Sequence, residues 1–144
     1  MTLKLKVQQN FVALPVDEGD ELYPNGLFEF NITKMLAFIH SSERIQPEQI
    51  KINDFYRCYS TINESHILNV DLSQPIILAE ISPRNFNIID GNHRIEKAKR
   101  EEQEYILAFK IQPQDHLQFL TSKKSYKIYV DYWNEKLSEL KYIS

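Results

Sequence analysis

The sequence predicts an α+β domain, in which a small mixed β-sheet is flanked by three or four helices and a long helix packs across it at the C-terminal end. Two observations carry this prediction. Residues 75–89 contain two apolar runs separated by turn residues, which is typical of a β-hairpin at the centre of the sheet. After Pro113 the apolar residues recur every three or four positions, which indicates a helix. No linker or repeat divides the 144 residues, so we expect a single domain over residues 1–144.

The N-terminal third predicts a strand, a loop and a helix. Apolar and lysine residues alternate over residues 3–7, as in a strand with one buried face. Residues 17–26 are rich in turn formers and predict an exposed loop. Asn31 or Thr33 can cap the helix that follows. The apolar residues of this helix fall at helical spacing: Ile32, Met35, Leu36 and Ile39.

The middle of the chain predicts short elements around the hairpin. Residues 50–55 suggest a strand leading into a helical turn, whereas residues 61–70 fit a helix or a loop equally well. Residues 92–100 predict a helix that carries a pair of opposite charges four residues apart, Glu96 and Arg100, on its outer face. Residues 105–111 then return as an apolar strand.

The predicted C-terminal helix carries one continuous apolar stripe. Its residues step by four, three, four and three: Tyr126, Val130, Trp133, Leu137 and Leu140. Such a stripe packs against the sheet as core, or it forms the seam of an oligomer. Both interpretations are open at the level of sequence.

Charge and cysteine content bound the partners. The chain has 17 basic and 20 acidic residues, a net charge of −3, and a pI of about 5.8, which disfavours nucleic acid as a partner. No apolar stretch is long enough to span a membrane, and the N-terminus lacks the apolar block of a signal peptide. Cys58 is the only cysteine and cannot form an internal disulfide, so we expect a cytoplasmic protein. The four histidines show no zinc spacing, and we expect His40 and His116 to be solvated.

Glycine is scarce, which excludes Gly-rich phosphate loops of the Rossmann and Walker types. The three glycines are Gly19, Gly26 and Gly91. Gly91 alone lies between a predicted strand and a predicted helix, where the amides of Asn92, His93 and Arg94 would form the positive end of the helix. Arg94 can bind a phosphate with two hydrogen bonds, and His93 can donate a hydrogen bond or carry a proton. The turn is therefore a candidate site for a di- or triphosphate.

Two charged neighbours have alternative roles. Asp90 could orient Arg94, coordinate a metal that bridges phosphates, or cap the helix, and capping is the commonest of these. Lys97 follows His93 by one turn, so it could add positive charge toward a ligand or simply be solvated. A purely structural interpretation, with Arg94 paired to a surface carboxylate and His93 at the edge of a pocket, explains the same five residues.

Residues 88–98, Ile-Ile-Asp-Gly-Asn-His-Arg-Ile-Glu-Lys-Ala, resemble the signature of the ParB/sulfiredoxin superfamily. In that signature a strand ending in Gly or Asp-Gly precedes a variable residue, then His-Arg or Arg-Arg, and then a helix. The segments that resemble the approach to this signature in small ParB-like proteins are 63–67, 70–71 and 75–78. Residues 23–26, Tyr-Pro-Asn-Gly, are similar to the first ParB box, so the resemblance covers residues 20–111.

The resemblance implies a phosphate cradle that binds ATP or CTP with Mg²⁺. Gly91, His93 and Arg94 match its shared positions, whereas Asn92 occupies the variable position that is cysteine in sulfiredoxins. Sulfiredoxin chemistry needs a thiolate there, so this activity is rejected, and Cys58 is expected to be a structural thiol. No segment resembles the helix-turn-helix domain of chromosome-partitioning ParB proteins. Other relatives phosphorylate free serine or are described as ParB-like nucleases.

The approach segment supplies two further catalytic candidates beside His93. Glu64 and His66 lie in the segment that, in the resembling small proteins, precedes the hairpin carrying the phosphate turn, and they matter for catalysis if the fold brings them close to it. Glu64 could act as a general base or a Mg²⁺ ligand in phosphoryl transfer. The alternative is local, because Asn63 and its neighbours could merely cap a helix.

Three functions are consistent with these observations. The first is a nucleotide- or phosphate-binding domain with hydrolysis or phosphoryl transfer at the Gly-Asn-His-Arg turn. The second is a non-catalytic interaction domain of a small operon or mobile element, which docks a partner through its C-terminal helix. The third is a ParB-like nuclease, which the acidic composition disfavours.

Overall fold

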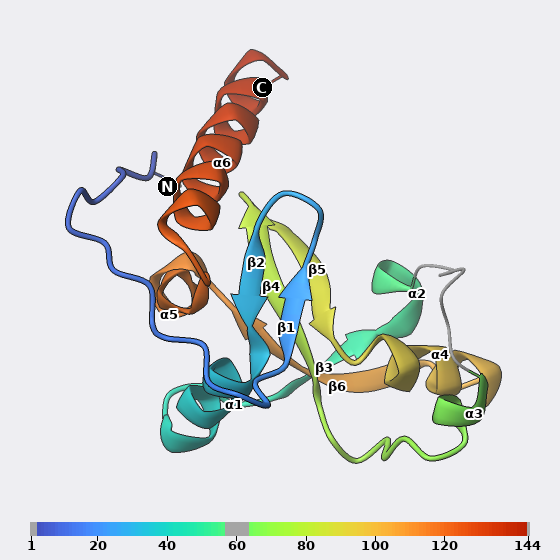
Figure 1. The fold of residues 1–144 in the computed structure, drawn as a ribbon. Helices are drawn as coiled ribbons and strands as arrows, with labels where there is room; N and C mark the ends of the chain where they lie inside the picture. Colours follow the sequence, from blue (N-terminus) through green and yellow to red (C-terminus); the bar gives the residue numbers. More distant parts are fainter. Residues whose placement is uncertain (1–2, 57–63, 144) are drawn as a thin grey trace.

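The computed structural model describes residues 3–56 and 64–143 as a mixed α+β fold (Figure 1). The strands are β1 (Leu22–Pro24), β2 (Glu29–Asn31), β3 (Glu48–Lys51), β4 (Ile76–Ser82), β5 (Asn85–Asp90) and β6 (Tyr105–Ile111). The helices are α1 (Ile32–Ser41), α2 (Ile52–Phe55), α3 (Glu64–Ile67), α4 (Asn92–Arg100), α5 (Pro113–His116), the 3₁₀ helix η1 (Leu117–Phe119) and α6 (Lys123–Ile143). Of the helices in these two ranges, none is long and apolar enough to cross a membrane. The single-turn helices raise the helix count above the three or four expected.

Four strands form the main sheet in the order β3-β6-β4-β5. β4 pairs with β5 as an antiparallel hairpin and with β6 in parallel, so β5 and α4 together form the crossover between the two parallel strands. β1 and β2 form a separate two-stranded sheet. The predicted hairpin is confirmed, but only β4 is central, because β5 lies at the edge of the sheet.

The alternation of side chains along β4 creates two cores. Ile77 and Ala79 point to one face of the sheet, and Ile76 and Leu78 point to the other, and all four are fully buried. The first face is covered by α1, α6 and the β1–β2 hairpin, and the second by α2 and α4 (Figure 1). A strand buried on both faces explains why residues 75–81 are almost continuously apolar.

Most of the C-terminal stripe belongs to the first core. Tyr126, Val130, Trp133 and Leu137 are all buried in α6, while Leu140 near the helix end is 44% exposed. Tyr129, which lies beside the stripe, is also completely buried. Tyr126, Val130 and Trp133 belong to the first core and Leu137 is buried outside that cluster, so four of the five stripe residues are buried within this one chain.

Residues 3–7 do not form the predicted strand. They run extended along α6, and the side chain of Asn134 both accepts from the Leu5 amide and donates to the Leu5 carbonyl, each at 2.8 Å. The indole Nε1 of Trp133 donates to the Leu3 carbonyl at 3.2 Å. Leu5 and Val7 are partly buried, as the alternation predicts, whereas Leu3 is 70% exposed. Side chains of a helix replace a neighbouring strand as hydrogen-bond partners.

Three other local predictions, a helix cap, a loop and an outward-facing charge pair, can be compared with the structure. Asn31 caps α1 by accepting from the amide of Lys34 at 3.1 Å, as one of the two alternatives proposed. The loop expected at residues 17–26 contains β1. Glu96 is 7% exposed rather than on an outer face, and it binds both Arg100 and the Tyr56 hydroxyl at 2.9 Å.

Candidate functional site

α4 begins at a glycine whose conformation only glycine adopts readily. Gly91 is the N-cap residue, with φ of 106° and ψ of 23°, and no side chain caps the helix. A Cβ at this position would overlap Ile76, with the Ile76 Cβ only 2.8 Å away. The first intrahelical bond runs from the Ile95 amide to the Gly91 carbonyl at 3.0 Å, so the amides of residues 92–94 lie at the positive end of the helix. The sequence prediction of a sharp strand-to-helix turn is confirmed.

A pocket of about 570 Å³ opens in front of this turn. Its walls come from the residue before β1, β1 itself, α3, the loop after α3, the end of β5 and the first turn of α4. The lining residues are Glu21, Tyr23, His66, Val70, Ile89, Asp90, Gly91, Asn92, His93 and Arg94. This volume is within the range of pockets that hold small ligands. The pocket gathers most of the predicted site residues, from segments far apart in the chain.

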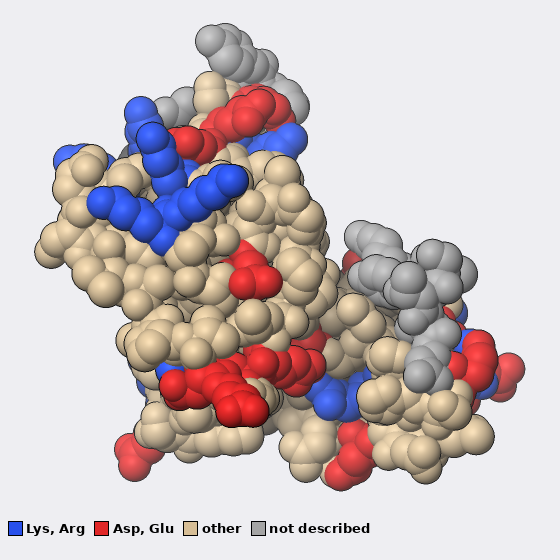
Figure 2. Space-filling view, viewed as in Figure 1, with Lys and Arg blue, Asp and Glu red and all other residues tan. Residues whose placement is uncertain are grey.

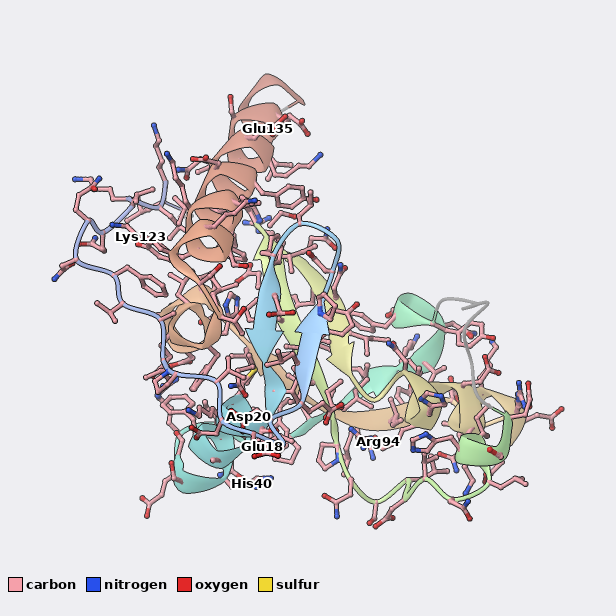
Figure 3. The ribbon with its side chains drawn as sticks, in the orientation of Figure 1. Glu18, Asp20, His40, Arg94, Lys123 and Glu135 are labelled. Carbon is pink, nitrogen blue, oxygen red and sulfur yellow. The ribbon has the colours of Figure 1, made fainter. Side chains whose placement is uncertain are left out.

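Arg94 lies where β5 meets α4 (Figure 3). One terminal nitrogen donates to Asp90 Oδ2 at 3.1 Å and to the Pro75 carbonyl at 3.4 Å. Asp90 therefore orients Arg94 and does not cap the helix, contrary to the interpretation preferred from sequence. Among the described residues, the buried atoms Arg94 Nε and Asn92 Oδ1 have no hydrogen-bond partner. Buried polar atoms without a partner are rare in folded proteins, so two of them at one turn call for an explanation.

Two histidines stack inside the pocket. The rings of His66 and His93 lie 4.7 Å apart between centroids and 27° from parallel. Partial burial lowers the pKa of His93, and the nearby His66 lowers it further. His93 belongs to the predicted turn, and the structure brings His66 beside it, which the sequence had left open.

The sequence did not predict the wall of the pocket that Glu21 and Tyr23 form, in which Glu21 supplies an acidic group. Glu21 precedes β1 and Tyr23 lies within it, and both line the pocket across from α4. Burial raises the pKa of the Glu21 carboxyl, and the charge of Asp90 raises it further. The only signal in the sequence was the similarity of residues 23–26 to the first ParB box.

The surface around this wall is acidic. Figure 2 shows Asp and Glu side chains gathered over the loop that leads into β1, where Figure 3 labels Glu18 and Asp20. A basic side chain adjoins them at the position of Arg94 in Figure 3. The basic side chains of the first turns of α6, where Lys123 is labelled, gather far from the pocket. Among the described residues that line the pocket, Arg94 is the one lysine or arginine.

Two predicted residues lie outside the pocket. Glu64 is highly exposed and forms a double hydrogen bond with Arg100, which lowers the pKa of its carboxyl group. This arrangement does not fit the expected general base or Mg²⁺ ligand, because the carboxylate is directed to Arg100 and not to the pocket. Lys97 is partly buried and donates to the Val70 carbonyl at 3.2 Å, and it is not among the residues that line the pocket.

The described residues provide no ready metal site. Across residues 3–56 and 64–143, no three His, Cys, Asp or Glu side chains are placed to hold a metal ion. Asp90, the carboxylate nearest the turn, is already bound to Arg94. Asn63 and Cys58, to which the sequence assigned capping and structural roles, lie outside the described residues.

A scan against protein-family models finds none that matches this chain, and a search of curated proteins finds no matching sequence. Any assignment of function therefore starts from the pocket itself.

Proposed function

We propose that the pocket binds a nucleotide or another small phosphate ligand, in a fold of the ParB/sulfiredoxin type. One observation carries the proposal: an uncapped helix N-terminus, entered through Gly91, faces a half-enclosed pocket together with Arg94 and two imidazoles. Free amides and the helix dipole favour an anion at such a position. The resemblance of residues 88–98 to a phosphate-cradle signature agrees with this interpretation.

The residues divide the work by their chemistry. The amides of Asn92, His93 and Arg94 and the Arg94 guanidinium would hold the phosphate. Tyr23 and Val70, which also line the pocket, would contact the remainder of the ligand. Mg²⁺, if used, would enter with a nucleotide, because the described side chains offer no site of their own. Hydrolysis or phosphoryl transfer would draw on His93 and His66, which are the titratable bases beside the turn.

Calorimetric titration with ATP, CTP, GTP and inorganic phosphate tests the proposal, in the wild type and in Arg94→Ala. Losing a charge-assisted hydrogen bond costs about 1.5 to 3 kcal/mol, so we expect affinity to fall roughly 10- to 100-fold. Arg84→Asn is the matched control, since Arg84 lies in the β4–β5 turn outside the pocket and asparagine tolerates its φ of 65°. Absence of binding by all four ligands, or equal affinity in the wild type and Arg94→Ala, would refute the proposal.

A further inference from the structure

The fixed charges of the pocket do not by themselves favour an anion. Glu21 and Asp90 contribute two negative charges to the wall, and Arg94 contributes one positive charge, so the sum is −1 when both histidines are neutral. Asp90 also takes up part of the charge of Arg94 at 3.1 Å. A doubly charged phosphate would therefore enter a wall of its own sign, apart from the partial charge of the helix N-terminus.

We propose that the site takes up its phosphate ligand together with a proton, which the stacked His66–His93 pair carries. This inference rests on the proposed function and adds the condition under which the site accepts its ligand. One proton on the pair brings the sum of lining charges to zero, and the phosphate then stabilises the imidazolium. The ligand class that gains most is a dianionic terminal phosphate, since the attraction grows with its charge.

The geometry of the pair suits this role. Both rings line the pocket, so a phosphate on the first turn of α4 lies beside them. At a centroid distance of 4.7 Å, two imidazolium ions would repel each other, so the pair accommodates one proton and not two. Partial burial, and then the nearby His66, lower the pKa of His93 and so disfavour its charged form. An anion bound beside the rings would offset this penalty and raise the affinity of the pair for one proton.

Several other charged groups on the elements around the pair are bound to protein partners and do not line the pocket. On α3, Glu64 is bound to Arg100 of α4, so neither changes the balance inside the pocket. Lys97 of α4 is bound to the Val70 carbonyl, and Asp71 accepts from the side chain and amide of Ser73. Glu21 is the alternative proton carrier, because its pKa is raised and it faces the same space.

Proton uptake can be measured directly by titrating the protein with sulfate and with inorganic phosphate. Each titration is repeated in two buffers of different ionisation enthalpy, near pH 6.5 and near pH 8. Sulfate does not titrate in this range, so any proton taken up with it resides on the protein. Linkage predicts that one proton per anion raises affinity up to about tenfold for each unit of falling pH. The ring-proton NMR signals of His66 and His93 should shift to higher apparent pKa on addition of either anion.

Variants assign the proton to its carrier. In His66→Asn and His93→Asn we expect the uptake measured with sulfate to fall by half or more. His40→Asn is the matched control, because His40 on α1 is exposed and lies well away from Arg94 (Figure 3). Glu21→Gln should retain the uptake and tighten binding, because it removes a negative charge from the wall.

The outcomes separate the two proposals. Binding with no proton uptake, or uptake that is lost in Glu21→Gln and kept in both histidine variants, overturns the inference and leaves the proposed function standing. Failure of phosphate, sulfate and all nucleotides to bind at either pH overturns the proposed function, and the inference with it.

Discussion

The two faces of the main sheet are built differently. The face under α1 and α6 is rich in buried aromatic residues, with Phe28 packed edge-on against Tyr129 at 5.2 Å between centroids. The other face is covered by α2 and α4, and its buried members among the described residues are aliphatic. Large interlocking rings contribute heavily to stability. The candidate pocket lies where the two faces meet, because Tyr23 and Ile89 pack with the aromatic core while α4 covers the aliphatic one.

Histidine shows a second contrast, within one residue type. His116 is completely buried in the aromatic core, contrary to the solvated position expected from sequence, and its Nε2 donates to the Glu80 carbonyl at 2.8 Å. Burial lowers its pKa to about 4, so it stays neutral. His93 instead lines a polar pocket next to another imidazole. Burial with a fixed backbone partner explains a structural histidine, whereas the place of His93 in the pocket is what the proposed proton uptake requires.

Gly91→Ala, at the turn into α4, is expected to have the largest effect on the free energy of unfolding. A methyl group there overlaps Ile76 in the small core and also imposes the left-handed φ on alanine. Together, overpacking and backbone strain should lower the free energy of unfolding by about 2 to 5 kcal/mol, measured by urea denaturation. Gly26→Ala is the control, since Gly26 has φ of 93° and a Cβ added there would meet nothing within 4 Å, so only about 1 to 2 kcal/mol is expected. Equal losses in the two variants would show that Ile76 does not set the turn.

The elements that determine the turn could be predicted because their signals are local. β4, β5, α4 and β6 follow from apolar runs, turn residues and a single glycine within 37 consecutive residues, 75–111. Continuous apolarity in β4 reflects burial on both faces, and the sequence of strand, glycine and helix specifies the positive helix end. The same local signals predicted α1 and α6.

What could not be predicted depends on contacts distant in sequence. Glu21 lines the pocket only because β1 lies across from α4, and a lone glutamate before a three-residue strand carries no periodic signal. His116 follows a proline turn that reads as polar, yet Tyr129, 13 residues later, folds over it. Residues 3–7 have the alternation of a strand, but the Asn134 side chain satisfies the Leu5 backbone. In each case a tertiary contact overrides the local pattern.

An intermediate effect on the free energy of unfolding is expected when the pH is lowered, because His116 is buried in the aromatic core. His116 has a pKa of about 4 in the folded protein and about 6.5 when unfolded, so the unfolded chain binds a proton first as pH falls. The stability that neutral His116 contributes is fully present above about pH 6.5 and is lost as pH falls toward 4. By pH 5 the free energy of unfolding should have fallen by about 2 kcal/mol for this reason.

His116→Gln provides the comparison for this loss. Its amide can still donate to the Glu80 carbonyl, but it does not titrate. The free energy of unfolding, measured at about pH 7.5 and pH 5, should fall less in the variant than in the wild type. The same pH dependence in both proteins would assign the acid sensitivity to other groups. It would also contradict the contrast drawn between His116, as a histidine that stays neutral in the core, and the His66–His93 pair.

The smallest effect is expected from Glu64→Gln, which tests whether Glu64 lies outside the pocket. Glu64→Gln should leave phosphate or nucleotide affinity, and any hydrolysis of the nucleotide, within about twofold of the wild type, since its carboxylate lies on Arg100 at the surface and its ion pair is screened by water. Arg100 keeps its second partner, Glu96, so the melting temperature should also be unchanged. Glu21→Gln, measured in parallel, should tighten binding because it removes a negative charge from the wall. A strong loss of hydrolysis in Glu64→Gln would instead restore the general base expected from sequence, and would mean that α3 moves toward the pocket when ligand binds.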